Sequence, residues 1–262
     1  MSARILVTGG TGYLGRLVVP RLVSAGEEVR VVSRSPHASA DGVRYVVADW
    51  ETGEGLAQAV GDAEVVVHLA GDQLHNEPMA RALVRAVRDA GAQPHLVNIS
   101  VVGAEKVPVR SAFDRRALGY MASKLAQERV LEESGIAWTN LRATQFHELV
   151  LIAARALAKL PVVPTPTGWQ AQPIAADEVA ARLVELAHGE PQGRVPDVAG
   201  PEVLTFRAMV RAYLDAVGSR RPTMPVRVPG AASRAYAAGG NLAPDRAVGK
   251  QTWAEFLAEH VA

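Results

Sequence analysis

Short apolar runs alternate with longer stretches of helical periodicity over the first 145 residues. Val, Leu and Ile dominate runs such as 5–7, 29–32 and 64–68, which is typical of strands buried on both faces of a parallel sheet. Between these runs, apolar residues recur every three or four positions, as from Leu14 to the helix stop at Gly26. The alternation predicts an α/β fold with a doubly wound parallel sheet and right-handed crossovers.

The pattern also places the individual elements. The expected strands are residues 5–7, 29–32, 44–48, 64–68, 95–100 and 137–141, and the expected helices are 14–25, 52–60, 79–90 and 120–134. Beyond these the alternation loosens, with helices expected at 149–160, 177–188, 205–217 and 252–260 and a strand at 195–199. We therefore predict a core domain over 1–145 and a small lobe over 146–262, of which 177–188 and 195–199 pack back on the sheet.

Composition and charge exclude several classes of protein. The 262 residues carry 28 basic and 27 acidic side chains, and a net charge of +1 argues against nucleic acid as the main partner. The absence of cysteine excludes a disulfide framework, a thiol nucleophile and a thiolate metal site. No histidine pair shares a helix face, so no metal is expected. With no apolar run of roughly 18 residues and no export pattern at the start, we expect a cytoplasmic protein without a membrane partner.

A glycine-rich loop follows the first expected strand and opens the first expected helix. It reads G-G-T-G-Y-L-G over residues 9–15 and so contains G-x-G-x-x-G. Glycine permits the sharp turn and lets the backbone approach a diphosphate, whose charge the helix N-terminus stabilises. This context predicts a dinucleotide-binding site. The expected cofactor contacts in the loop are Gly9, Thr11, Gly12, Tyr13, Leu14 and Gly15.

The residues after the second expected strand predict which dinucleotide binds. Ser33 and Arg34 stand where an NAD site usually has a carboxylate for the ribose 2′-hydroxyl, and a hydroxyl with a guanidinium suits a 2′-phosphate. We therefore expect NADP(H) to be preferred over NAD(H). Asp49, at the end of the third expected strand, either accepts a hydrogen bond from the adenine amine or caps the following turn. Further cofactor contacts are expected from Trp50, Leu69, Ala70 and Gly71.

Tyr120 and Lys124 are four residues apart in an expected helix and therefore lie on one face of it. A nearby ammonium lowers the pKa of a phenol, so Lys124 is expected to lower the pKa of Tyr120. Such a tyrosine can donate a proton to a carbonyl oxygen as hydride arrives. Ser100 ends its strand at the ligand-binding edge and is expected to hydrogen-bond the same oxygen. We predict that Ser100, Tyr120 and Lys124 are catalytic; the alternative for the last two is an ordinary surface pair.

These motifs resemble those of atypical short-chain dehydrogenase/reductases, near the NmrA-like NAD(P)H-binding proteins. The similarity rests on residues 8–15, 65–70, 98–103, 120–124, 141–147 and 241–244. The resemblance implies a Rossmann core, a small C-terminal substrate-binding lobe, and nicotinamide contacts from the loop after Arg142, here Ala143 and Thr144. The expected substrate contacts are Gln145, Phe146, His147 and His75. His147 is equally expected to be a packed loop histidine.

The expected function is an NADPH-dependent carbonyl reductase. The substrate would be a small, largely apolar ketone, enone or quinone; Tyr120 would supply the proton, and Lys124 would bind the ribose and tune Tyr120. Two other classes stay open. A regulatory protein that senses NAD(P)H would need the glycine loop but not Tyr120, and an epimerase or dehydratase would retain its nucleotide tightly. The sequence also leaves open whether the chain is a monomer or a homodimer.

Overall fold

The structure is a computed structural model, which describes residues 2–39, 42–72 and 74–261. Two compact units make up the chain. Unit 1 comprises Met1–Ser100, Ser123–Leu141 and Asp177–Val195, and unit 2 comprises Val101–Ala122, Arg142–Ala176 and Pro196–Ala262. Each unit thus combines segments that are distant in the sequence, and segment 177–188 belongs to the unit of the sheet. The predicted domain boundary after residue 145 stays a prediction.

A seven-stranded sheet forms the centre of unit 1, in the order β3-β2-β1-β4-β5-β6-β9. Its strands are β1 (Arg4–Thr8), β2 (Glu28–Ser33), β3 (Val43–Val47), β4 (Val65–His68), β5 (His95–Val101), β6 (Trp138–Ala143) and β9 (Gly193–Arg194). Strands β2 and β4 flank β1 in parallel, and β3, β5 and β9 run parallel to β2, β4 and β6. The strand order reverses between β1 and β4, and α/β sheets bind ligands at the carboxyl ends of such a switch point.

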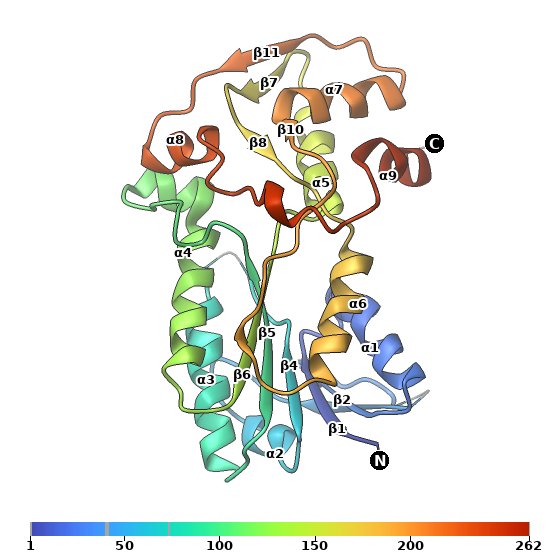
Figure 1. Cartoon of the computed structure of the whole chain (residues 1–262), viewed down its shortest axis with the longest axis vertical. Coiled ribbons are helices and arrows are strands. Elements are labelled where there is room, and N and C mark those ends of the chain that lie inside the picture. Colours follow the sequence, from blue (N-terminus) through green and yellow to red (C-terminus); the bar gives the residue numbers. More distant parts are fainter. Residues whose placement is uncertain (1, 40–41, 73, 262) are drawn as a thin grey trace. The chain divides into compact units, whose positions relative to one another are not determined.

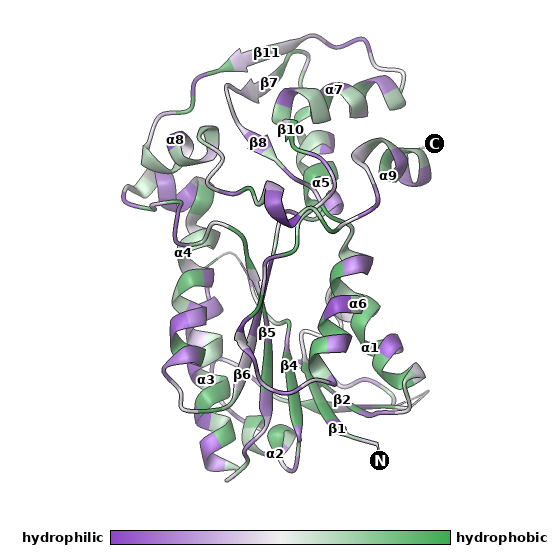
Figure 2. Cartoon of the chain, viewed as in Figure 1, coloured by the Kyte–Doolittle hydropathy of each residue, from purple (hydrophilic) through white to green (hydrophobic). Residues whose placement is uncertain are grey.

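Helices cover both faces of this sheet (Figure 1). Helices α1 (Gly15–Ser24) and α6 (Ala176–Ala187) lie on one face, and α3 (Asn76–Asp89) and the later part of α4 (Ala112–Glu132) lie on the other. The short helix α2 (Leu56–Val60) packs against α3. Strands β1 and β4 are predominantly hydrophobic (Figure 2), and almost all of their side chains are buried. The predicted α/β fold with a doubly wound parallel sheet is confirmed.

Unit 2 contains two small sheets and most of the C-terminal helices. The parallel pair is β7 (Val163–Pro166) with β11 (Thr223–Val226), and the antiparallel pair is β8 (Gln170–Ala171) with β10 (Leu204–Thr205). The helices are α5 (His147–Leu157), α7 (Phe206–Ala216), α8 (Ala231–Ala237), the 3-10 turn η1 (Pro244–Arg246) and α9 (Trp253–His260). Helices α5, α7 and α9 enclose an apolar core around the buried Trp253 and Phe256.

Helix α4 differs most from its prediction, because it begins at Ala112 instead of residue 120. Ser111 and Asp114 cap this start: Ser111 Oγ accepts the Asp114 N–H at 2.9 Å, and Asp114 Oδ2 accepts the Ser111 N–H at 3.0 Å. At Leu118 the backbone leaves the helical conformation (φ −139°, ψ 20°) and the helix kinks. The kink breaks the periodicity across the helix, so the sequence pattern predicts only the part after it.

Two smaller differences also have local causes. Helix α2 begins at Leu56 instead of residue 52 because Gly53 and Gly55 adopt positive φ before it. The strand expected at 195–199 is wrong, since β9 covers only Gly193–Arg194 and Val198 and Ala199 form isolated bridges. Among the helices of the described residues, none is both long enough and apolar enough to cross a membrane.

Candidate functional site

The glycine-rich loop joins β1 to α1 in unit 1. Gly9 has a φ of +70°, and its carbonyl oxygen accepts the Gly12 N–H at 2.9 Å, so the chain turns tightly after β1. A Cβ at Gly9 would lie 2.6 Å from the Ala70 nitrogen, and a Cβ at Gly15 would overlap the Gly9 carbonyl oxygen. A side chain at either position would separate backbone segments that now touch, which explains the need for glycine there.

The start of α1 is suited to an anion. Among the described residues, no side chain caps this helix at Leu14, and its first turn holds no carboxylate. The first N–H groups of such a helix are unsatisfied and carry a partial positive charge. Gly12 is exposed, and a Cβ there would meet only the Gly9 oxygen, at 3.1 Å, so the loop surface is open to a ligand. These residues therefore fit the diphosphate of a dinucleotide.

The segment that follows β4 lies beside this loop. The Leu69 N–H donates to the Thr8 carbonyl oxygen at 3.0 Å, and the Ala70 N–H donates to Thr8 Oγ1 at 3.2 Å. The next residue, Gly71, has no room for a Cβ because it would overlap Asn76 Oδ1. The structure thus brings Leu69, Ala70 and Gly71 to the switch point, and their contact with the cofactor stays a prediction.

Ser33 and Arg34, which are predicted to select the nucleotide, lie at the same edge of the sheet. Ser33 is the last residue of β2, and Arg34 follows it. Ser33 is buried, and its Oγ accepts the Ser35 N–H at 3.2 Å. Arg34 is exposed, and within the part of the chain that the structure describes it forms no ion pair with a carboxylate. Its guanidinium is therefore accessible to a phosphate.

Asp49 and Trp50 follow β3. Asp49 Oδ1 accepts the N–H groups of Glu51 at 2.6 Å and Thr52 at 3.2 Å, so this oxygen caps the following turn, the second of the two interpretations of Asp49. The Trp50 ring is tilted against the His68 ring, with centroids 6.0 Å apart. The predicted contacts of Asp49 and Trp50 with the cofactor stay predictions.

Lys124 is buried in unit 1, with 3% of its surface exposed. Its Nζ donates to the Ile99 carbonyl oxygen at 3.1 Å and to Gln127 Oε1 at 2.9 Å. Burial lowers the pKa of Lys124 to about 8, although nearby Glu128 raises it. The ammonium is therefore fixed beside the end of β5 and loses its charge at a much lower pH than an exposed lysine. Sequence reasoning missed Gln127, because a glutamine one helical turn after a lysine is not a recognisable motif.

Ser100 is the second-to-last residue of β5 and is also buried. Its Oγ has no hydrogen-bond partner among the described residues, so it is available to a ligand oxygen. His68, at the end of β4, is fully buried with Nδ1 2.7 Å from Thr8 Oγ1. Burial and, to a smaller extent, the charge of Lys124 lower the pKa of His68 to about 3. This histidine is neutral at neutral pH and adds no second cation to the site.

Ser123 and Asn76 connect α4 to the start of α3, and sequence reasoning missed both. Ser123 Oγ accepts hydrogen bonds from the Asn76 backbone N–H at 3.2 Å and from its Nδ2 at 3.0 Å. Asn76 Nδ2 also donates to the Asp72 carbonyl oxygen at 2.6 Å. These bonds fix the loop after β4 to the residue that precedes Lys124. Their signal in the sequence is weak because the two partners are 47 positions apart.

His75 lies in this same loop, and its side chain is exposed. Its Nδ1 is 2.6 Å from Asp72 Oδ2. Partial burial raises the pKa of Asp72, but hydrogen bonds from the His75 side chain and from the backbone of His75 and Leu74 outweigh this and lower it overall. The structure thus pairs His75 with a carboxylate, and its role toward a substrate stays a prediction.

Tyr120 lies in unit 2, just after the kink of α4. About a third of the residue is exposed, but the protein around the hydroxyl group desolvates it and raises the pKa of Tyr120 to about 12, with a further contribution from Tyr236. The expectation that Lys124 lowers this pKa is wrong for this structure, because desolvation is the dominant effect. The phenol is protonated at neutral pH, as a proton donor must be.

The segment after β6 is held by hydrogen bonds within unit 2. Ala143 and Thr144 are buried, and the Thr144 N–H donates to the Val198 carbonyl oxygen at 3.0 Å. Thr144 Oγ1 accepts the Gly200 N–H at 3.3 Å. The backbone carbonyl oxygen of the next residue, Gln145, accepts a hydrogen bond of 3.0 Å from the Ile174 N–H. The predicted nicotinamide contacts of Ala143 and Thr144 stay predictions.

Phe146 and His147 begin α5. Phe146 is half-buried at the N-cap position. His147 has 1% of its surface exposed, its Nε2 donates to the Gln251 carbonyl oxygen at 3.0 Å, and its ring stacks on Phe256 and Trp253 at 4.9 and 5.8 Å. This is the environment of a packed histidine, the second of the two interpretations of His147. The predicted substrate contacts of Phe146 and His147 stay predictions.

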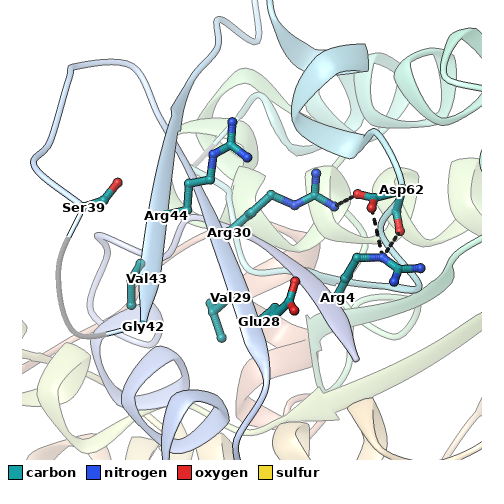
Figure 3. A pocket seen from close by; sticks show the side chains of 9 residues that line it. All are labelled: Arg4, Glu28, Val29, Arg30, Ser39, Gly42, Val43, Arg44 and Asp62. Carbon is teal, nitrogen blue, oxygen red and sulfur yellow. Dashed lines mark hydrogen bonds and ion pairs between the residues drawn. The ribbon is translucent and has the colours of Figure 1, made fainter. Parts of the chain in front are cut away.

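A cavity of about 490 Å³ lies at the amino ends of β1, β2 and β3 in unit 1. Figure 3 shows the side chains that line it. Arg4, Glu28 and Val43 line it where their strands begin. Arg4 and Arg30 form ion pairs with Asp62 at 3.0 and 2.7 Å. Open α/β sheets bind ligands at their carboxyl edge, so this cavity is not the dinucleotide site. In the described part of the chain, no three His, Asp or Glu side chains gather as metal ligands would.

Comparison with known proteins assigns the chain to a class. A family model described as NAD(P)H-binding matches residues 9–189. The chain is 30% identical over 210 residues to a (4-alkanoyl-5-oxo-2,5-dihydrofuran-3-yl)methyl phosphate reductase of Streptomyces griseus, covering 78% of this chain and 70% of that protein. It is 30% identical over 229 residues to an NAD(P)H azoreductase of Xenophilus azovorans, covering 82% of this chain and 74% of that protein.

A solved structure shares the fold over nearly the whole length. It is the NADPH-dependent quinone oxidoreductase from Escherichia coli in complex with NADPH, with a TM-score of 0.81 and 19% sequence identity, covering 97% of this chain and 99% of that one. The chain therefore belongs to the NAD(P)H-binding family, as an NAD(P)H-dependent reductase of the atypical, NmrA-like short-chain dehydrogenase/reductase kind.

Proposed function

We propose that this protein uses NADPH to reduce the carbonyl group of a small, largely apolar compound of the ketone or quinone type. The observation that carries the proposal is the position of Ser100 and Lys124 in unit 1. Both lie at the end of β5, at the carboxyl edge to which the glycine loop also belongs, and Ser100 has a buried hydroxyl without a partner among the described residues. Tyr120 precedes Lys124 by one helical turn.

The residues around the switch point suit NADPH. The loop at Gly12 and the uncapped start of α1 would bind the diphosphate, and Arg34 with Ser33 would bind the 2′-phosphate. Lys124 would bind the nicotinamide ribose. When bound, NADPH supplies a hydride to the carbonyl carbon of the substrate.

The side chains of the chain supply the rest of the chemistry. The protonated Tyr120 phenol donates its proton to the carbonyl oxygen, on which negative charge develops. The Ser100 hydroxyl donates a hydrogen bond to the same oxygen and so stabilises that charge. The phenolate that remains on Tyr120 then takes up a proton from solvent, which its raised pKa favours.

Replacement of Arg34 tests the preference for NADPH. In Arg34→Glu the guanidinium is lost and a carboxylate repels the 2′-phosphate, so we expect the Kd for NADPH to rise by about tenfold or more while the Kd for NADH changes little. Isothermal titration calorimetry with both nucleotides measures this. Arg85→Glu, an exposed arginine on α3, is the matched control. An equal loss for NADPH and NADH would contradict the assignment.

The pH dependence of reduction tests Lys124. Because burial places the pKa of Lys124 near 8, the fraction of charged ammonium falls as pH rises through that value. We therefore expect kcat/KM to decline on the alkaline side with an apparent pKa near 8, long before Tyr120 loses its proton. Gln127→Leu removes an acceptor of the ammonium and should move the decline to lower pH, whereas Gln127→Glu should move it to higher pH.

Of the other ionisable groups near Lys124, His68 is already neutral in this pH range, and Glu128 acts on Lys124 by raising its pKa. If kcat/KM of both Gln127 variants declines at the same pH as in the original protein, a group other than Lys124 is responsible for the decline.

The experiment for the function as a whole is a panel of ketones and quinones offered to the purified protein with NADPH, without oxygen. Oxidation of NADPH with at least one compound supports the proposal. Tight NADPH binding without oxidation across the panel would favour the regulatory, NAD(P)H-sensing alternative.

A further inference from the structure

Two aromatic rings of unit 2 form a fixed pair that the proposed chemistry does not use. The Trp169 and Tyr236 ring centroids are 5.0 Å apart, with the planes tilted by 39°. Trp169 Nε1 donates to Ser233 Oγ at 2.9 Å, which holds the indole in one orientation. Both residues are half-buried, so part of each ring remains accessible. We call Trp169 and Tyr236 the aromatic pair.

The aromatic pair lies near the catalytic phenol. Tyr236 is close enough to Tyr120 to contribute to its raised pKa. Asp114, near the start of α4, contacts the beginning of α8, because a Cβ at Gly230 would lie only 2.5 Å from Asp114 Oδ1 and the carboxylate accepts a hydrogen bond from the Ala232 backbone. Helix α8, which carries Tyr236, is thus attached to the part of α4 before the kink, and Tyr120 follows that kink by two residues.

The Gln145 side-chain amide lies beside the hydroxyl group of Tyr236. Burial raises the pKa of Tyr236 to about 12, and the neighbouring Gln145 side chain opposes this rise. Yet the Gln145 Nε2 and Oε1 atoms are buried, and neither has a hydrogen-bond partner of good geometry among the described residues. A buried amide whose hydrogen bonds are this poorly formed is costly, and a ligand that accepts from it or donates to it would remove that cost. Gln145 offers one end as a donor and the other as an acceptor.

We propose that the aromatic pair and Gln145 form a subsite for a planar aromatic carbonyl compound, with the ring system on Trp169 and Tyr236 and a carbonyl oxygen accepting from the Gln145 amide. The inference rests on the proposed function and narrows its substrate class. Stacking on aromatic rings contributes beyond the burial of apolar area, so a planar quinone gains more here than a saturated ketone of the same size. A carbonyl oxygen also satisfies the Gln145 donor, which a hydrocarbon ring cannot do.

Binding without turnover tests the subsite. The protein is saturated with NADP⁺, which prevents reduction, and titrated by calorimetry with 1,4-naphthoquinone and with 1-decalone, a saturated bicyclic ketone of similar size. In Tyr236→Leu we expect the affinity for naphthoquinone to fall about tenfold and that for decalone by no more than about twofold. Tyr236→Phe keeps the ring and should keep the affinity. Gln145→Ala should weaken both ligands by a similar factor.

The controls separate a local effect from misfolding. Tyr45→Leu removes an aromatic ring that is tilted against the His37 ring in unit 1, and it should leave both affinities unchanged. Thermal unfolding of each variant shows whether it is folded. If Tyr236→Leu is not folded, Gln145→Ala provides the result, and unchanged affinities in that variant would overturn the subsite. Unchanged binding of naphthoquinone in Tyr236→Leu, or equal losses for both ligands, would overturn the subsite.

These measurements also separate the two proposals. Tyr236-dependent binding of naphthoquinone with no NADPH oxidation would refute the reductase function and leave the subsite. Turnover of quinones with an unchanged KM in Tyr236→Leu would leave the function and refute the subsite.

Discussion

Replacing Tyr120 with phenylalanine is expected to lower kcat for carbonyl reduction by about a thousandfold, because the proton donor is lost while the ring remains. The pKa of Tyr120, raised to about 12, means that the phenol carries its proton over the whole physiological range. Steady-state kinetics with NADPH and a ketone or quinone measure the loss.

Two further measurements make this result specific. The Kd of Tyr120→Phe for NADPH should stay within about twofold of the original, since the phenol makes no contribution to diphosphate binding in this account. Tyr213→Phe removes the hydroxyl of a tyrosine in α7 of the same unit and should retain full activity. Turnover of Tyr120→Phe at the original rate would remove Tyr120 from the mechanism.

The second large effect is expected at Gly12, where alanine should weaken NADPH binding by about a hundredfold. The added Cβ would stand where the loop backbone approaches the diphosphate. The loss of stability should be small, because that Cβ has one close contact, the Gly9 oxygen at 3.1 Å, which has to shift by a few tenths of an ångström. Calorimetry gives the Kd, and thermal unfolding in the absence of nucleotide gives the stability.

Gly26→Ala is the matched control at the other end of α1. It places alanine at a φ of +88°, where a Cβ meets nothing within 4 Å. This variant should lose stability through backbone strain yet bind NADPH normally. If Gly12→Ala bound NADPH as tightly as Gly26→Ala, the diphosphate would not lie on this loop.

The sequence predicted the fold and the strand-end positions because both depend on local patterns. Continuous apolar runs identify the buried strands, and the carboxyl ends of parallel strands meet at one edge. Gly9, Ser33, Leu69 and Ser100 could therefore be assigned to that edge from the sequence alone. The start of α4 was missed because the kink at Leu118 separates it from the periodic part of the helix.

The environment of the candidate catalytic groups could not be predicted in the same way. The pKa of Tyr120 depends on desolvation by residues distant in the sequence, so the expected lowering by Lys124 was wrong. Gln127 was missed because its contact with the Lys124 ammonium depends on how deeply the helix is buried. The contact within the aromatic pair could not be predicted for the same kind of reason. Trp169 and Tyr236 are 67 residues apart in the sequence, and only the fold of unit 2 brings their rings together.

The most direct test of the account is a single turnover. The protein is loaded with an equal amount of NADPH under argon and mixed rapidly with excess 1,4-naphthoquinone, while the fluorescence of the reduced nicotinamide is followed. We predict that all bound NADPH is oxidised in one protein-dependent phase, which Tyr120→Phe slows by about a thousandfold. Bound NADPH that remains reduced, or that is oxidised equally fast in Tyr120→Phe, would contradict the proposed reduction.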